Sequence, residues 1–324
     1  LKQQGDVIWN IANLLRGPYR PPQYRRVMIP LTVLRRLDCM LEGSKDKVLA
    51  HYKKLKAEGK DEETIEKVIA HKFGLPIFNI SEFTFQKLLG DPEKLAANLR
   101  NFMAGFSGRA RRIIEKFKFD EEIEKLEDAN RLFEVVKEIA AVDLHPEKIP
   151  NIAMGYVFED LVRRFNEQAN EEAGDHFTPR EVIKLMVKLL FTHDDLVYKP
   201  AKVIKIYDPT CGTGGMLSES EKLIADPDSG LNPGANVQLF GQEYNPESYA
   251  ICGSDLMIKG EGVKNIVYGN TLGTGKAKVT AESLRTWSSR LTNDSMVAVR
   301  TSTRATSRGS SPSSAPAPAI GTTP

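Results

Sequence analysis

The chain has 324 residues, with 41% hydrophobic and 27% charged side chains and a formal net charge of +2. This composition is typical of a soluble globular protein with room for two domains. The small net charge excludes a strongly basic nucleic-acid-binding protein and an acidic tail protein, so any contact with a polyanion needs a local patch or a partner.

The cysteines and the apolar runs indicate the compartment. Cys39, Cys211 and Cys252 are far apart and lack the Cys-x-x-Cys or histidine spacing of metal sites. The sequence therefore predicts no metal site and no disulfide framework, which fits a reducing cytosol. No apolar run approaches the length of about 18 residues that a membrane span needs, and no signal peptide opens the chain, so we expect a cytoplasmic protein that does not bind a membrane. The first residue, Leu1, is what a fragment of a longer product would show.

Residues 1–150 are predicted to form an all-helical domain. Apolar residues recur at helical spacing over 7–15, a break follows at Gly17-Pro18, and the spacing resumes over 27–41. Further helical patterns cover residues 61–72, 92–104, 108–117 and 128–140. Little strand signal separates them, so the class of this domain is all-α.

Two more helices are expected before the first strand. One covers about residues 151–168, and the next begins after an acidic loop. Thr178 is a natural N-cap, Pro179 suits the first helical position, and Glu181 would complete a capping box.

A strand, a glycine turn and a helix follow, and they predict a ligand site. The apolar run 203–206 precedes Asp208-Pro209-Thr210-Cys211-Gly212-Thr213-Gly214-Gly215. In doubly wound sheets such a turn binds a nucleotide-like cofactor, because glycines let the backbone approach the ligand. The Asp208 carboxylate would repel a pyrophosphate, which prefers bare N–H groups, but it would attract an ammonium and a sulfonium. It therefore favours S-adenosylmethionine over a nicotinamide dinucleotide, although a generic Rossmann turn remains the alternative.

Strands and helices alternate after this turn. A strand is predicted over 237–243, a helix from Asn245 to about residue 258, and a third strand over 265–268. This alternation predicts a parallel sheet with right-handed crossovers, and thus an α/β fold. From residue 273 to 324 both periodicities disappear and Ser, Thr, Ala and Pro come to dominate, so we expect this tail to lack structure.

Five segments in this order resemble the modification subunit of type I restriction–modification systems, an N6-adenine DNA methyltransferase. They are residues 14–20 (Leu-Leu-Arg-Gly-Pro-Tyr-Arg), 33–38 (Val-Leu-Arg-Arg-Leu-Asp), 154–159 (Met-Gly-Tyr-Val-Phe-Glu), 176–181 (His-Phe-Thr-Pro-Arg-Glu) and 208–215. The resemblance covers about residues 1–272. It implies an N-terminal helical domain (1–150), a partial Rossmann-like S-adenosylmethionine-dependent methyltransferase domain (151–272) and a disordered or out-of-frame tail (273–324).

The resemblance also implies roles for individual residues. Phe177, Thr178 and Pro179 would lie against the methionine end of S-adenosyl-L-methionine, and Asp208 would face its ammonium group. Glu243 would accept both ribose hydroxyls, with a solvated strand-end carboxylate as the alternative. The full expected set is Phe177, Thr178, Pro179, Asp208, Pro209, Gly212, Thr213, Gly214, Gly215, Glu243 and Asn270. Asn270 would lie near the adenine ring, but Gly-Asn-Thr is also an ordinary turn.

The sequence departs from the family at the catalytic motif. Such enzymes hold the flipped adenine with an Asn/Asp-Pro-Pro-aromatic tetrapeptide, and the 324 residues contain none. We therefore assign no catalytic residue, and a shift of reading frame near residues 272–275 would explain the loss. Two functions stay open: a methyltransferase subunit that transfers methyl to adenine in DNA, and a catalytically inactive remnant that at most binds cofactor or the specificity subunit.

The resemblance implies DNA, a specificity subunit and a restriction subunit as partners. Two groups of basic residues could contact DNA phosphates, although a solvated surface is the commoner role of such charges. The groups are Arg16, Arg20, Arg25, Arg26, Arg35 and Arg36, and then Arg109, Arg111 and Arg112.

Overall fold

We analysed a computed structural model, which describes residues 2–173, 178–195, 197–199, 203–260, 263–271 and 296–298. The N-terminal part is helical, as the sequence predicts. Its α-helices are α1 (Lys2–Ile11), α2 (Arg25–Ala57), α3 (Glu62–Phe73), α4 (Phe85–Leu88), α5 (Leu95–Ala104), α6 (Gly108–Glu115), α7 (Phe119–Asp128) and α8 (Leu132–Ala141). Short 3₁₀ helices occur at Ala12–Leu15, Pro21–Gln23 and Pro92–Lys94.

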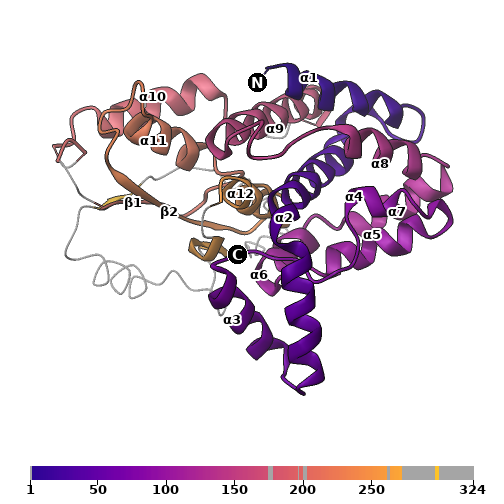
Figure 1. Ribbon diagram of the computed structural model, residues 1–324. Helices are drawn as coiled ribbons and strands as arrows, with labels where there is room; N and C mark the ends of the chain where they lie inside the picture. Colours follow the sequence, from indigo (N-terminus) through magenta and orange to yellow (C-terminus); the bar gives the residue numbers. More distant parts are fainter. Residues whose placement is uncertain are drawn as a thin grey trace, which may run out of the picture.

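Helix α2 is longer than its apolar pattern indicates. The predicted helix over residues 27–41 continues to Ala57, because Val48 and Leu55 pack with Ile65 and Ile69 of α3 in a second, smaller core. Figure 1 shows this end of α2 and α3 projecting together from the rest of the molecule.

The sequence analysis missed helix α7. Its sequence is strongly acidic, but Phe119, Ile123 and Leu126 form a buried stripe at helical spacing. The helix expected over 128–140 corresponds to α8 and begins four residues later than predicted, because α7 ends at Asp128 and α8 begins at Leu132.

A parallel sheet forms the second part of the molecule. Its strands are β1 (Val203–Asp208), β2 (Asn236–Glu243), β3 (Ile266–Tyr268) and β4 (Met296–Ala298), in the order β3-β2-β1-β4. All three strand pairs are parallel, and Glu243 at the end of β2 is in register with Tyr268 at the end of β3. The predicted α/β class with a preceding helical domain is confirmed.

Strand β4 lies inside the segment expected to lack structure. Met296–Ala298 pairs with residues 205–207 of β1 and hydrogen-bonds an edge that would otherwise expose unpaired backbone groups. For these three residues the expectation of disorder is wrong. The rest of 273–324 lies outside the described residues.

Four helices connect and cover the sheet: α9 (Asn151–Ala173), α10 (Arg180–Phe191), α11 (Gly215–Ala225) and α12 (Pro246–Ile258). Figure 1 shows α12 in the middle, with the sheet, α10 and α11 on one side and α2, α4, α5, α7 and α8 on the other. Every residue from Ala250 to Ile258 is buried, because α12 packs on β2 and β3 and also on α2, α6 and α9. One core therefore extends through both parts of the chain.

Helix α10 starts one residue later than predicted. Pro179 is extended, with ψ at 141°, and the helix begins at Arg180 without a side-chain cap. Pro179 rather than Thr178 is then the N-cap residue, and Glu181 pairs with Lys184 at 3.2 Å. The predicted capping box does not form.

Candidate functional site

The glycine turn after β1 begins at a buried carboxylate. Asp208 is fully buried, and its Oδ1 accepts a hydrogen bond of 3.0 Å from the backbone N–H of Thr210. Gly212 and Gly214 follow with φ of +57° and +89°, in the left-handed region that favours glycine. Asp208 therefore fixes the first bend of the turn, and its expected role toward a cofactor stays a prediction.

The glycines of this turn serve two different needs. A Cβ at Gly214 would lie 3.0 Å from Sγ of Cys252, and one at Gly215 would lie 2.9 Å from Cδ1 of Ile183, so these two residues let α12 and α10 pack closely. A Cβ at Gly212 would have nothing within 4 Å. The backbone at Gly212 therefore borders open space, where a ligand could approach.

Glu243 is fixed at the end of β2 by two backbone donors. Its Oε2 accepts a 2.8 Å hydrogen bond from the N–H of Gly212, and its Oε1 accepts one of 2.6 Å from the N–H of Asn245. Asn245 caps α12 by accepting from the N–H of Ser248 at 3.0 Å. The carboxylate thus joins the glycine turn to the start of α12, which is more than a solvated strand end.

The end of β3 completes this edge of the sheet. The N–H of Gly269 donates to the carbonyl of Glu243 at 2.9 Å, and the hydroxyl of Thr271 donates to the carbonyl of Pro209. Asn270 lies between these two anchors and is exposed. Pro209, Gly212, Glu243 and Asn270 therefore meet at the carboxyl edge, where parallel α/β sheets bind ligands.

The start of α10 is anchored beside the turn by an ion pair that the sequence analysis did not identify. Arg180 Nε lies 3.4 Å from Oε1 of Glu159 in α9. Both side chains line a cavity of about 40 Å³ together with Thr213 and Gly214. Burial raises the pKa of Glu159, and the nearby Arg180 charge opposes that rise. The sequence offered one signal for this pair: Glu159 and Arg180 each lie in one of the segments that carry the family resemblance, 154–159 and 176–181.

The expected segment 177–179 is only partly described. Thr178 and Pro179 are exposed, and Phe177 lies outside the described residues.

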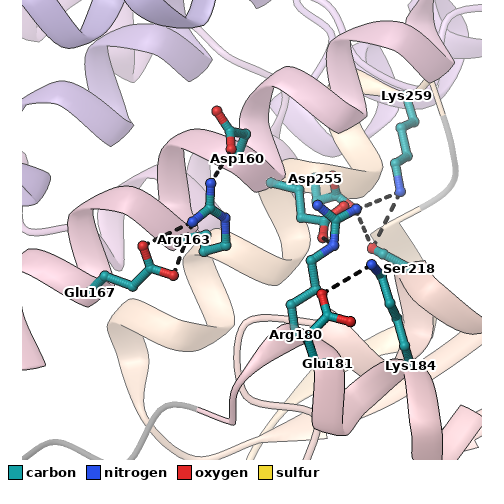
Figure 2. Close-up of polar contacts among 10 residues, drawn as sticks. Asp160, Arg163, Glu167, Arg180, Glu181, Lys184, Ser218, Asp255 and Lys259 are labelled. Carbon is teal, nitrogen blue, oxygen red and sulfur yellow. Dashed lines mark hydrogen bonds and ion pairs between the residues drawn. The ribbon is translucent and has the colours of Figure 1, made fainter. Parts of the chain in front are cut away.

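Figure 2 shows Arg180, at the start of α10, beside Ser218, Asp255 and Lys259. Lys259 Nζ lies 2.7 Å from Asp255 Oδ2, and the Ser218 hydroxyl donates to the same carboxylate at 2.9 Å. These contacts hold α11 against α12 next to the turn.

Cys211 behaves as a small neutral packing residue, as expected. Its Sγ lies 3.9 Å from Sγ of Cys252, and this contact together with burial raises the pKa of the Cys211 thiol. Gly241 makes room for it, because a Cβ there would lie 2.8 Å from Sγ of Cys211.

Three arginines of the first basic group make contacts within the chain that the sequence analysis did not anticipate. Arg36 is fully buried and donates to the Leu144 carbonyl and, at 2.7 Å, to Asn151. Arg35 donates to the Val142 carbonyl at 3.0 Å. Arg25 pairs with Glu247 of α12 at 3.1 Å. The charge of an arginine in the sequence does not reveal partners that are more than 100 residues away along the chain.

Tyr244 is a further exposed residue at this edge that the sequence analysis did not select. It follows Glu243 directly and is 67% exposed, which is unusual for a large aromatic ring.

Among the described residues, no group of three or more His, Cys, Asp or Glu side chains could hold a metal ion. In the same part of the chain, no helix combines the length and apolarity needed to cross a bilayer.

Two family models match the chain. Residues 5–139 match the HsdM N-terminal domain, and residues 151–295 match the N-6 DNA Methylase family. The chain belongs to the N6 DNA methylase family, among the type I restriction–modification methylase subunits. The match to the N-6 DNA Methylase family continues past residue 272, where the resemblance recognised in the sequence ends.

Known members of the N6 DNA methylase family show how much of a subunit this chain contains. The type I restriction enzyme HindI methylase subunit of Haemophilus influenzae is 28% identical over 33% of this chain and 21% of its own length. The MjaIX methylase subunit of Methanocaldococcus jannaschii is 24% identical over 79% of this chain and 45% of its own length. The chain thus spans less than half the length of these curated relatives.

A solved structure supports the fold. The crystal structure of the type I restriction–modification methyltransferase subunit from Streptococcus thermophilus superposes with a TM-score of 0.58 at 20% identity. The match covers 85% of this chain and 61% of the solved one.

Proposed function

We propose that this chain forms the cofactor-binding part of a DNA adenine-N6 methyltransferase subunit that uses S-adenosyl-L-methionine. The observation that carries the proposal is the hydrogen bond from Gly212 to Glu243, because it ties the glycine turn to the carboxylate at the neighbouring strand tip. The open space at Gly212 and the exposed ring of Tyr244 border the same edge. These residues fit a ligand with a ribose and a flat base.

The roles of individual residues are part of this proposal. Glu243 retains free lone pairs for the ribose hydroxyls, since each carboxylate oxygen accepts one backbone hydrogen bond. Asp208 would supply negative charge for the ammonium group, and Asn270 would lie near the adenine. Pro209, Gly212, Thr213, Gly214 and Gly215 would form the backbone floor, and Phe177, Thr178 and Pro179 would cover the methionine end.

When bound, S-adenosylmethionine supplies an activated methyl group, so the chain contributes mainly binding and orientation. Adenine in DNA is the proposed acceptor, and a specificity subunit and a restriction subunit are the proposed partners, in the cytoplasm. We keep the domain boundary near residue 150, which falls between the two family matches.

A catalytically inactive remnant is the second candidate. The observation in its favour is that the 324 residues contain no Asn/Asp-Pro-Pro-aromatic tetrapeptide. Such a chain would bind cofactor or the specificity subunit without transferring methyl.

Two measurements test these candidates. Isothermal titration with S-adenosylmethionine should show binding that is lost in Asp208→Asn and kept in Asp228→Asn, an exposed control. Binding of NAD in its place, or equal binding by both variants, would contradict the cofactor assignment. Labelled-methyl transfer to adenine-containing DNA, with and without the specificity subunit, separates the candidates, because incorporation above background excludes the remnant.

A further inference from the structure

The structure separates the three arginines of α6, which the sequence could not distinguish. Arg111 lies 3.9 Å from Glu115 and donates to the Ala104 carbonyl at 3.3 Å. Arg109 and Arg112 are exposed, and within the described part of the chain neither forms an ion pair. Together with Lys116 they recur at positions i, i+3 and i+7, which lie on one side of a helix.

This row of charges borders an aromatic pair. Lys116 Nζ lies 3.9 Å from the centroid of the Tyr268 ring, and this ring meets Tyr249 edge-on at 5.4 Å. Burial raises the pKa of Tyr249, and the charges of Arg112 and Arg109 oppose that rise. Lys and Arg side chains gathered on one surface are the groups that neutralise nucleic-acid phosphates.

The row is held rigidly against the methyltransferase domain. Ile113 packs so closely on Gly253 that a Cβ there would lie 2.8 Å from Cδ1 of Ile113. Figure 1 shows α6 beside α12, and the two helices are in contact. The charges therefore keep a fixed position relative to the sheet.

The row also lies next to the proposed cofactor edge. Tyr268 is the last residue of β3 and is in register with Glu243 of β2. A polyanion on α6 would thus lie beside the strand ends that form the site. Seven residues of helix span about 10 Å, which is enough to face several phosphates of a duplex that carries one charge per about 1.7 Å.

We propose that Arg109, Arg112 and Lys116 form a binding surface for the phosphate backbone of duplex DNA. The inference rests on the proposed function, since it takes DNA as the substrate. It explains how a chain with a net charge of only +2 could bind a polyanion. Arg109 and Arg112 form no ion pair with any described residue and lie on one rigid surface. By contrast, contacts within the chain engage Arg25, Arg35, Arg36 and Arg111. The contacts are independent of sequence, because phosphates carry no base identity.

A matched pair of variants tests the surface. Arg112→Gln and Arg111→Gln make the same change at adjacent exposed positions of α6, and both should leave the thermal transition nearly unchanged. Binding of a fluorescent DNA duplex to the full chain is measured by anisotropy over a range of salt concentrations. Arg112→Gln should make the negative slope of log K against log salt shallower by about 0.9, and the double variant Arg109→Gln/Arg112→Gln should make it shallower by about twice that, because each lost phosphate contact releases fewer counterions. Arg111→Gln should keep the slope of the unmodified chain.

The outcomes separate this surface from the cofactor site. Equal slopes for Arg111→Gln and Arg112→Gln, or no binding of duplex by the unmodified chain, would overturn the inference. Titration with S-adenosylmethionine in the same variants should give unchanged affinity. A chain that binds duplex through Arg112 but takes up no S-adenosylmethionine would contradict the proposed function and leave the surface intact.

Discussion

The backbone N–H of Gly212 donates a hydrogen bond of 2.8 Å to the carboxylate of Glu243. The two residues are 31 positions apart, and the bond joins the turn after β1 to the tip of the neighbouring strand. Glu243 also accepts from the N–H of Asn245, so one side chain fixes both loops at this edge.

Replacing Glu243 by Ala should therefore weaken both the fold and cofactor binding. Two backbone donors lose their acceptor, and leaving the partly buried N–H of Gly212 without one costs about 1–3 kcal/mol. Glu243→Gln should lower stability and cofactor affinity less than Glu243→Ala does. One oxygen remains to accept a hydrogen bond, but the new NH₂ group faces a backbone donor. Urea unfolding and titration with S-adenosylmethionine measure the two effects. Glu181→Ala, which removes an exposed carboxylate paired with Lys184, is the control and should change neither. A stable Glu243→Ala protein with full affinity would contradict the assigned role.

Gly214→Ala should destabilise the protein by about 2 kcal/mol, because φ is +89° and the new Cβ would press on Cys252. Gly43→Ala is the matched control. Gly43 lies inside α2 with open space where a Cβ would be, so alanine should stabilise the helix by up to about 1 kcal/mol. Denaturant unfolding measures the change in free energy of unfolding for both variants, and an unchanged or increased stability of Gly214→Ala would show that the turn tolerates a side chain.

Lys259→Met should be strongly destabilising. The side chain is 10% exposed and its charge meets Asp255 at 2.7 Å and Glu221 at 3.5 Å, so the change leaves carboxylates without their buried cation. Loss of one partner from such a pair costs about 3–5 kcal/mol. Lys67→Met removes an exposed pair with Glu63 and should cost less than about 1 kcal/mol. Thermal and urea unfolding compare the two, and similar losses would mean that the Lys259 pair is effectively solvated.

Lys45 should make stability depend on pH in the alkaline range. Burial lowers the pKa of Lys45 to about 8 in the folded protein, although Asp38 opposes the shift, against 10.5 for an exposed lysine. Between these values the unfolded chain binds more protons than the folded one, so the free energy of unfolding rises with pH.

The slope from Lys45 should reach at most about 1.4 kcal/mol per pH unit. It is measured as the difference between the unmodified protein and Lys45→Met in urea unfolding at pH 8 and above. Lys47→Met, at an exposed position of the same helix, should leave the slope in place. A slope that survives in Lys45→Met would assign it to another group.

Much of the site could be predicted because its signals are local. The run from Val203 to Gly215 encodes a strand, a bend and a helix within a few residues, and the structure has β1 and α11 at nearly the expected bounds. Helix α7 was missed because its three buried residues are outnumbered by acidic ones. The start of α10 was misplaced by one residue because Thr178 and Pro179 satisfy the rules for a cap even when Pro179 is extended.

The sequence by itself determined the family, the order of helices and strands, and the identity of the residues at the strand ends, because these depend on spacing and on residue type. Only the tertiary structure decided which charges are free. Arg36 and Arg112 look alike in the sequence, but Arg36 is buried against a distant carbonyl and Arg112 is exposed. The reason is physical: a charge is neutralised by whatever groups the fold brings near it, and those groups are far away along the chain.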